Sequence, residues 1–187
     1  MKKNKIIDSI ILDDIGELKV RFSKRAKYAR ISIDSRGEVT VTIPPQLKFE
    51  HVLEFVSSKK EWINKNKKKV KKQKLLKLKL SDNELKKFWR DTEERLFLLS
   101  KKYKLDYNQL IFKTLKSRWG SCSSNNVICL NNLLYYLPEY LQEYVMLHEL
   151  IHTRIKNHSF QFWNELENIC KNSKIKRKEL RDKYSIG

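Results

Sequence analysis

The chain has 187 residues, a formal net charge of +19, and apolar and aromatic fractions of 40% and 11%. Those fractions exclude a disordered chain, and the small numbers of Gly (4) and Pro (3) exclude collagen-like and low-complexity sequences. No apolar stretch approaches the roughly 20 residues that a membrane-spanning helix needs, and we find no apolar signal-peptide segment near the N-terminus. The three Cys residues form no CxxC pair, which favours reduced thiols and a cytoplasmic location.

Much of the positive charge lies in one segment, residues 59–79, which we call the Lys-rich segment. It contains eleven Lys residues and a single acidic residue, Glu61. One interpretation is a surface for nucleic acid, a nucleotide or another polyanion. The other is a solvated helix face with a linker. The second is favoured, because the segment is almost purely Lys rather than the mixture of Arg and aromatic residues that reads bases.

The first elements predicted from the N-terminus are strands. Three segments alternate apolar and polar residues with the period of two that is typical of half-buried strands: 18–22, 29–33 and 39–43. Gly37 lies in a turn between the last two, and Pro44 ends the third because proline cannot donate to a sheet. We therefore expect an antiparallel β-meander, followed by one or two amphipathic helices over 47–63 whose polar face the Lys-rich segment continues.

The second half of the chain mixes helices and strands. Ser81 and Glu84 form a capping box that predicts a helix to about Tyr103. The further elements expected are strands at 110–115 and 127–130 and helices at 138–154, 159–170 and 174–184. The predicted fold class is α+β, with a β-rich region and basic helix over 1–78 and a catalytic core over 79–187.

Three of the four His residues lie within eleven positions of one another. His148, Glu149 and His152 form an HExxH sequence inside a predicted helix. Side chains at i and i+4 lie on one helix face, so both imidazoles can reach the same ion. Zn²⁺ accepts neutral imidazole nitrogens, and Glu149 is placed to accept the proton of a water on that ion. The motif therefore predicts one Zn²⁺ per chain with Glu149 as the general base.

A zinc site that keeps one position open needs a third protein ligand. His158 is the candidate, although the chain must turn back after His152 to bring it to the metal. Metzincins use the same spacing with Gly at the position of Ile155, so this is not a metzincin signature. Asn157 tolerates left-handed geometry and is expected to make the turn instead. The remaining His51 stands alone in a predicted helix and is interpreted as structural or solvated.

Further motifs accompany the HExxH sequence in a specific order. They are RWGSCS at 118–123, ICLN at 128–131, Pro138, HELIH at 148–152, NHS at 157–159 and Phe162-Trp163. Together they resemble the YgjP-like metallopeptidase family, which is similar to the SprT and WLM metalloproteases. The resemblance implies a minimal zincin-like core, an active-site helix packed on a small sheet, with His148, His152 and His158 binding zinc. It also implies that the strand at 127–131 is the edge strand of the cleft, where an extended peptide could add by β-augmentation.

The RWGSCS segment has a functional and a supporting interpretation. Arg118 could bind an anion or a carbonyl oxyanion, and Ser121 could donate a hydrogen bond to a substrate. With Asn131, they are the candidate substrate-binding residues. In the supporting interpretation the segment forms a tight turn against the active-site helix. That role is favoured for Trp119, Gly120 and Cys122, because a Trp beside Gly usually packs.

Three functions compete. The leading hypothesis is a zinc-dependent metallopeptidase in which water activated by Glu149 attacks a peptide bond. The second hypothesis keeps the metal site but changes the substrate. In it, the protein is a nucleoside triphosphate pyrophosphatase that acts on UTP, an activity that is ascribed to some members of the resembled family. The third is a nucleic-acid-associated binding module or protease recruited through the Lys-rich segment. The expected partner of the first is a peptide or protein, and no membrane partner is expected.

Overall fold

The structure is a computed structural model that describes residues 6–72 and 74–186. The chain divides after residue 73 into two compact units, unit 1 (residues 1–73) and unit 2 (residues 74–187), and each has its own hydrophobic core. Helices and mixed sheets occur in both units, which confirms the α+β class. Residues 1–5, part of the segment searched for a signal peptide, lie outside the described residues.

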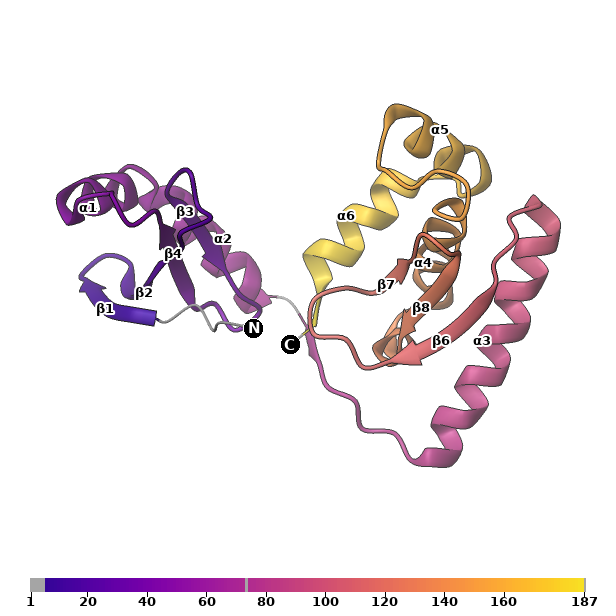
Figure 1. Cartoon of the computed structure of the whole chain (residues 1–187). Helices are drawn as coiled ribbons and strands as arrows, with labels where there is room; N and C mark the ends of the chain where they lie inside the picture. The colour runs from indigo at the N-terminus through magenta and orange to yellow at the C-terminus, as the bar shows by residue number, and fades with distance from the viewer. Residues whose placement is uncertain (1–5, 73, 187) are drawn as a thin grey trace. The chain divides into compact units, whose positions relative to one another are not determined.

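The sheet of unit 1 contains β1 (Ile6–Leu12), β2 (Gly16–Phe22), β3 (Arg30–Ile33) and β4 (Val39–Ile43). Its order is β1-β2-β4-β3, and β2 pairs with β4 in parallel while the other pairs are antiparallel (Figure 1). The predicted antiparallel meander is therefore wrong. Alternation identifies a strand and its buried face, but it does not determine which strand becomes the neighbour. Strand β4 lies inside the sheet and β3 at its edge. The side chains of Val39, Val41 and Ile43 are almost fully buried on the covered face of β4.

Two helices complete unit 1, α1 (Phe49–Ser58) and α2 (Lys60–Lys72), as the amphipathic pattern predicts. Their apolar residues Val52, Val56 and Ile63 share one core with the sheet. Most of the Lys-rich segment forms α2. Two of its lysines hold the turn between β1 and β2: Lys60 pairs with Asp14, and Lys67 Nζ donates to the Ile15 carbonyl at 2.7 Å. Part of the charge thus serves the fold of unit 1.

Unit 2 contains most of the elements expected in the second half of the chain. Its helices are α3 (Asp82–Tyr103), the 3₁₀ helix η1 (Asn132–Tyr136), α4 (Glu139–Ile151), α5 (Phe160–Ile169) and α6 (Ser173–Lys183). Its strands are β5 (Lys74–Leu76), β6 (Gln109–Lys113), β7 (Gly120–Cys122), β8 (Val127–Asn131) and β9 (Tyr184–Ile186). The capping box is confirmed, because Ser81 Oγ accepts from the Glu84 N–H while the Glu84 carboxylate accepts from the Ser81 N–H.

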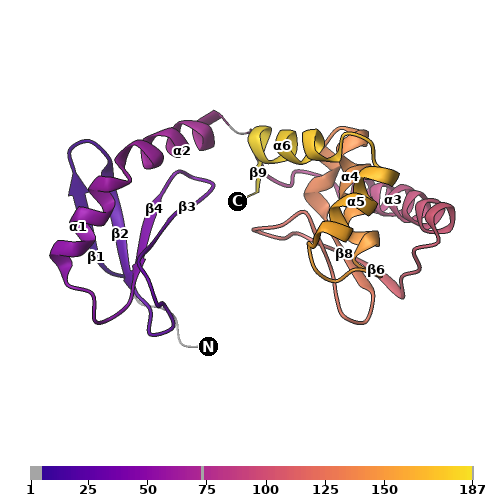
Figure 2. The same ribbon diagram turned by 90° about the horizontal axis from the view of Figure 1, so that it is seen from above.

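Helix α4 lies at the centre of unit 2 and contacts β7, β8 and the other three α-helices (Figure 2). Its sequence is apolar on almost every face, and Leu147, Leu150 and Ile151 are completely buried. Such a helix is stable only inside a core. The polar side chains of Gln142 and Glu149, which are buried with this helix, are therefore held in a rigid, largely dry environment.

Two sequence-based expectations about unit 2 need correction. The predicted boundary after residue 78 lies within this unit, because β5 pairs with β9 and Leu76 is buried in the core of unit 2. The strand at 127–131 is not the edge strand: the sheet order is β6-β8-β7, so β8 lies between its neighbours. The edge that adjoins α4 belongs to β7, which is antiparallel to β8 and was expected to be a turn.

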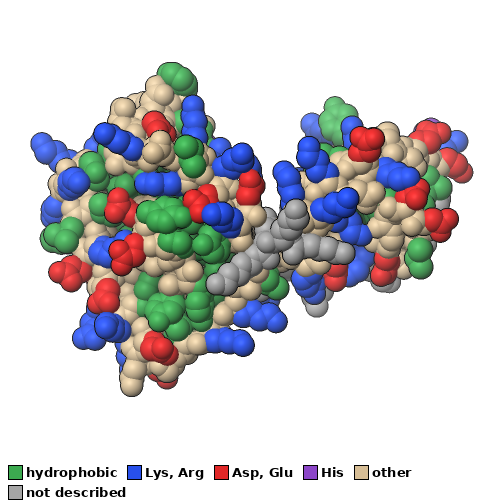
Figure 3. Space-filling view, turned by 180° about the vertical axis from the view of Figure 1, so that it is seen from behind, with side chains coloured by type: hydrophobic (Ala, Val, Ile, Leu, Met, Phe, Trp, Pro, Cys, Tyr) green, Lys and Arg blue, Asp and Glu red, His purple; other side chains and the backbone are tan. Residues whose placement is uncertain are grey.

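The surface carries its charge broadly. On the face shown in Figure 3, Lys and Arg side chains are scattered over both units and are interspersed with acidic ones. In the described part of the chain, no helix is long and apolar enough to span a membrane.

Candidate metal centre

Three His side chains meet at the C-terminal end of α4. His148 lies in its last turn, and His152 directly follows the last helical residue, Ile151. The Ile155 N–H donates to the Ile151 carbonyl at 2.8 Å, which turns the chain at the helix end. His158 then precedes α5 and points back to the residues that the chain has just left.

The Nε2 atoms of these side chains converge. His158 Nε2 lies 3.0 Å from His148 Nε2 and 3.1 Å from His152 Nε2. Two nitrogens bound at 2.0–2.1 Å to one tetrahedral ion lie roughly 3.3–3.4 Å apart. The three imidazoles therefore fit a divalent ion such as zinc, with one coordination position left open. Within the described residues, this is the one group of three or more metal-ligating side chains arranged in this way.

The protonation state of the three imidazole rings suits metal binding. His152 Nδ1 lies 2.9 Å from the Ile155 carbonyl, which can only accept, so Nδ1 carries the proton and Nε2 presents its lone pair. Burial is the main cause that lowers the pKa of all three imidazoles. With the charges of the neighbouring His rings and of Arg177, the pKa of His148 falls to about 3. For His152, the hydrogen bond to the Ile155 carbonyl opposes part of the fall in pKa. All three rings are thus neutral at pH 7, as metal ligands must be.

Aromatic side chains of α5 form the floor of the site. Phe162 is completely buried, and its ring centroid lies 4.8, 4.5 and 4.7 Å from those of His148, His152 and His158. The Trp163 ring stacks on His158 at 5.5 Å. His148 Nδ1 is buried with no hydrogen-bond partner among the described residues, so packing rather than hydrogen bonding orients this ring.

The Glu149 carboxyl packs against Gly120 of β7. A Cβ atom at Gly120 would lie 2.8 Å from both Cγ and Oε1 of Glu149, so the carboxyl occupies the space that any side chain at position 120 would need. Glu149 is 6% exposed, and burial raises its pKa to about 8 against the opposing positive charge of Arg118. A carboxyl poised near neutrality can both take up and release a proton.

A cavity of about 260 Å³ adjoins this carboxyl. Its lining comes from α4, α6 and the start of β7: Arg118, Trp119, Gly120, Tyr144, Val145, His148, Glu149 and Leu180. The cavity gives a small molecule or a peptide segment access to His148 and Glu149 together.

The three predicted substrate-binding residues occupy different places. Arg118 is exposed and lines the cavity beside Glu149. Ser121 lies on β7 opposite Cys129 and lines a separate cavity on the sheet. Asn131 has no exposed surface: its amide donates to the carbonyls of Leu115 and Arg118, both at 2.9 Å. The prediction that Asn131 contacts substrate therefore needs correction, because Asn131 holds the loop that carries Arg118.

Sequence reasoning also missed parts of this site. Phe162 belongs to one of the motifs that carry the family resemblance, but sequence reasoning assigned it no role in the site. The left-handed turn expected at Asn157 is wrong: among described non-Gly residues only Lys104, Asn126 and Asn172 have positive φ. Asn157 instead accepts a hydrogen bond from the Ser159 N–H at 3.2 Å, a side-chain turn that needs no unusual backbone.

The model of the YgjP-like metallopeptidase domain matches residues 27–97 and 76–183. The chain belongs to this family, a family of metal-dependent peptidases. No curated protein matches it. Two solved structures are similar to part of it. The metallopeptidase zymogen jannalysin of Methanocaldococcus jannaschii is 27% identical, over 48% of this chain and 91% of that one, with a TM-score of 0.42. The zymogen abylysin of Pyrococcus abyssi is 21% identical, over 51% and 99%, with a TM-score of 0.44. At such TM-scores, the assignment rests on the family model.

Proposed function

We propose that this YgjP-like protein is a zinc-dependent metallopeptidase whose ion is held by His148, His152 and His158. The observation that carries the proposal is the convergence of three neutral Nε2 atoms beside a buried carboxyl that is not one of the ligands. A divalent ion held there would supply Lewis acidity, which activates water and polarises a carbonyl.

The chain's own groups do the remaining work. Glu149 accepts the proton of the attacking water and passes it to the leaving amine, as a carboxyl with a pKa near neutrality can do in both directions. Because Gly120 has no side chain, the Glu149 carboxyl has room to lie beside β7. The positive charge of Arg118 lowers the pKa of Glu149 against the rise caused by burial, and so favours the ionised form that a general base needs. The Phe162 ring excludes water from the inner side of the imidazoles.

The substrate adds to β7 as an extended strand, in place of the edge strand first expected at 127–131. Strand β7 pairs with β8 on one side only within the described sheet. Addition of a strand there satisfies the free backbone groups of the edge and brings the peptide past Glu149. A peptide or protein is thus the substrate class, and zinc is the proposed ion.

Metal analysis tests the ligand set. Purified protein should contain about one equivalent of zinc, and His158→Ala should lose it while remaining folded. His51→Ala is the matched control, because His51 is exposed in α1 and distant in sequence from the motif. Equal zinc in the wild type and the His158→Ala variant would refute the three-His site.

Cleavage assays test the reaction. Glu149→Gln should keep zinc and lose at least about 100-fold in kcat on a peptide library, because it removes the general base alone. UTP is offered to the same preparations as a second substrate class. Full peptide cleavage by Glu149→Gln would refute the mechanism, and hydrolysis of UTP without peptide cleavage would replace the proposed function by the pyrophosphatase alternative.

A further inference from the structure

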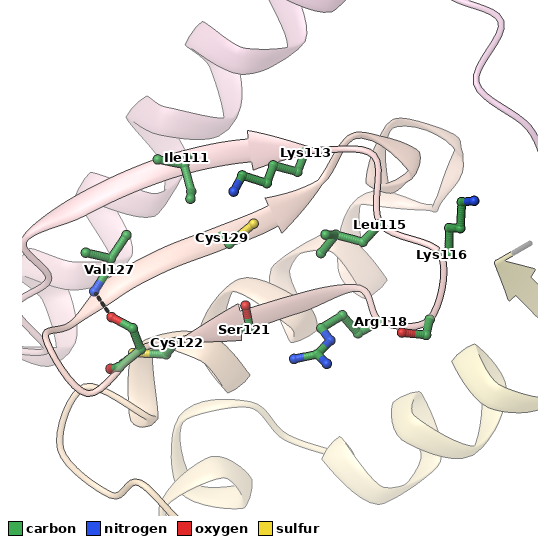
Figure 4. A pocket seen from close by; sticks show the side chains of 11 residues that line it. Ile111, Lys113, Leu115, Lys116, Arg118, Ser121, Cys122, Val127 and Cys129 are labelled. Carbon is green, nitrogen blue, oxygen red and sulfur yellow. Dashed lines mark hydrogen bonds between the residues drawn. The ribbon is translucent and has the colours of Figure 1, made fainter. Parts of the chain in front are cut away.

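A second cavity lies on the sheet of unit 2, on the face opposite to α4. Ile111, Cys129 and Ser121 are cross-strand neighbours on β6, β8 and β7. Successive residues of a strand point to opposite faces, and Gly120 faces Glu149 on α4. Ser121 and its two neighbours therefore face away from α4, where they line a cavity of about 570 Å³ (Figure 4).

The cavity is cationic. Lys113, Lys116 and Arg118 line it, and none of the described residues in its lining is Asp or Glu. No ion pair within residues 6–72 and 74–186 involves any of these three. Burial raises the pKa of the Cys129 thiol, but the charges of Lys113 and Arg118 oppose the rise, so both act on the same point of the sheet face. Figure 4 shows them on either side of Cys129.

The register of β7 connects this cavity to the proposed path of the substrate. Trp119 and Ser123 form backbone hydrogen bonds to β8, through the Trp119 carbonyl and the Ser123 N–H. In an antiparallel pair, residues whose backbone N–H and C=O bond to the neighbouring strand alternate with residues whose N–H and C=O point to the opposite side. The N–H and C=O of Gly120 and Cys122 thus face the open edge. A substrate residue lying beside Ser121 shares its face and directs its side chain into the cationic cavity.

We propose that the enzyme selects acidic peptides: substrates in which the side chain beside Ser121 is Asp or Glu, held by Lys113, Lys116 and Arg118. The inference rests on the proposed peptidase function and adds its substrate class. A peptide is favoured over a nucleotide because the cavity flanks a strand edge, whose alternating backbone groups pair with another strand. Arg118 lines both this cavity and the one beside Glu149, so the acidic side chain and the reacting bond are bound together.

The test uses one cleavable peptide in which each position is replaced in turn by Glu, Gln or Lys. At low salt, the wild type should cleave the Glu peptide about two- to fivefold faster in kcat/KM than the Gln peptide at one position, the effect of a partly screened ion pair. The preference should weaken as salt is raised. The double variant Lys113→Gln, Lys116→Gln should bring the ratio close to one. The matched control is Lys86→Gln, Lys87→Gln on α3, which removes the same charge from exposed positions and should keep the ratio.

Failure of this inference is distinguishable from failure of the proposed function. Cleavage of Glu and Gln peptides at equal rates, or a preference that survives the double variant, would overturn the acidic specificity and leave the peptidase intact. Binding of the labelled Glu peptide to the inactive Glu149→Gln protein, measured by fluorescence anisotropy, tests the cavity without turnover and should weaken in the Lys113, Lys116 background. Tighter binding of UTP or single-stranded DNA through the same two lysines would also overturn the proposal.

Discussion

The contact between Gly120 and Glu149 makes Gly120→Ala the most informative single change in the site. The new Cβ would lie 2.8 Å from Cγ and Oε1 of Glu149 and 3.0 Å from Cδ. Real Cβ atoms do not approach other heavy atoms this closely, so the carboxyl must move. Gly120 does not have a positive φ, so Ala fits its backbone, and the space alone is at issue.

Gly120→Ala should lower both the stability and the activity of the protein, but by different amounts. Overpacking at a buried contact costs about 1–3 kcal/mol, and the lower flexibility of Ala in the unfolded chain returns about 0.4–1 kcal/mol. The free energy of unfolding should therefore fall by about 2.6 kcal/mol at most. The kinetic loss should be larger, because displacement of a catalytic group by about 1 Å costs on the order of 100-fold. The variant should therefore be folded, metal-loaded and nearly inactive.

Three measurements on the same preparation check this expectation: zinc content, the urea midpoint, and kcat/KM on a reporter peptide. Asn125→Ala is the control, because Asn125 is exposed between β7 and β8 and lines neither of the two cavities. A Gly120→Ala enzyme within threefold of wild-type activity would show that the position of Glu149 against β7 does not matter. Loss of zinc together with activity would instead place the damage at the imidazoles, and would equally refute the reasoning.

Two further predictions concern stability. Asn131→Ala removes the hydrogen bonds from the Asn131 amide to the carbonyls of Leu115 and Arg118, and the one that its oxygen accepts from the Leu133 N–H. The free energy of unfolding, measured in urea, should fall by about 2–4 kcal/mol. As a control, replacement of the exposed Asn125 by Ala should change it by no more than about 0.5 kcal/mol. In the zinc-free protein, the folded-state pKa of His148 lies below its unfolded value of 6.5, so the stability that it contributes is present above pH 6.5 and is lost as the pH falls below it. His148→Gln should flatten the fall in stability between pH 6.5 and 5, by up to about 1.4 kcal/mol per pH unit, and an unchanged slope would contradict a buried neutral ring.

What the sequence predicts well in this protein is local. Ser81 and Glu84 lie three residues apart, and their reciprocal hydrogen bonds determine where α3 begins. The HExxH spacing likewise follows from one helical turn. The pairing of β2 with β4 and the interior position of β8 could not be predicted, because alternation defines a strand's faces without naming its neighbours. The contact between Gly120 and Glu149 could not be predicted either, because the two residues are far apart in sequence and only the folded sheet brings β7 against α4.

The turn between the second and third His shows how one geometry can be reached by different local chemistry. A Gly at the position of Ile155 would suggest a left-handed turn, yet Ile155 has no positive φ and its side chain is 9% exposed. Its N–H closes the helix end, its carbonyl orients His152, and its side chain is anchored in the core of unit 2. A buried apolar anchor thus replaces backbone freedom. Because burial holds this residue, exchange of Ile155 for Gly should loosen the turn and weaken zinc binding, although it would supply the Gly of the metzincin signature.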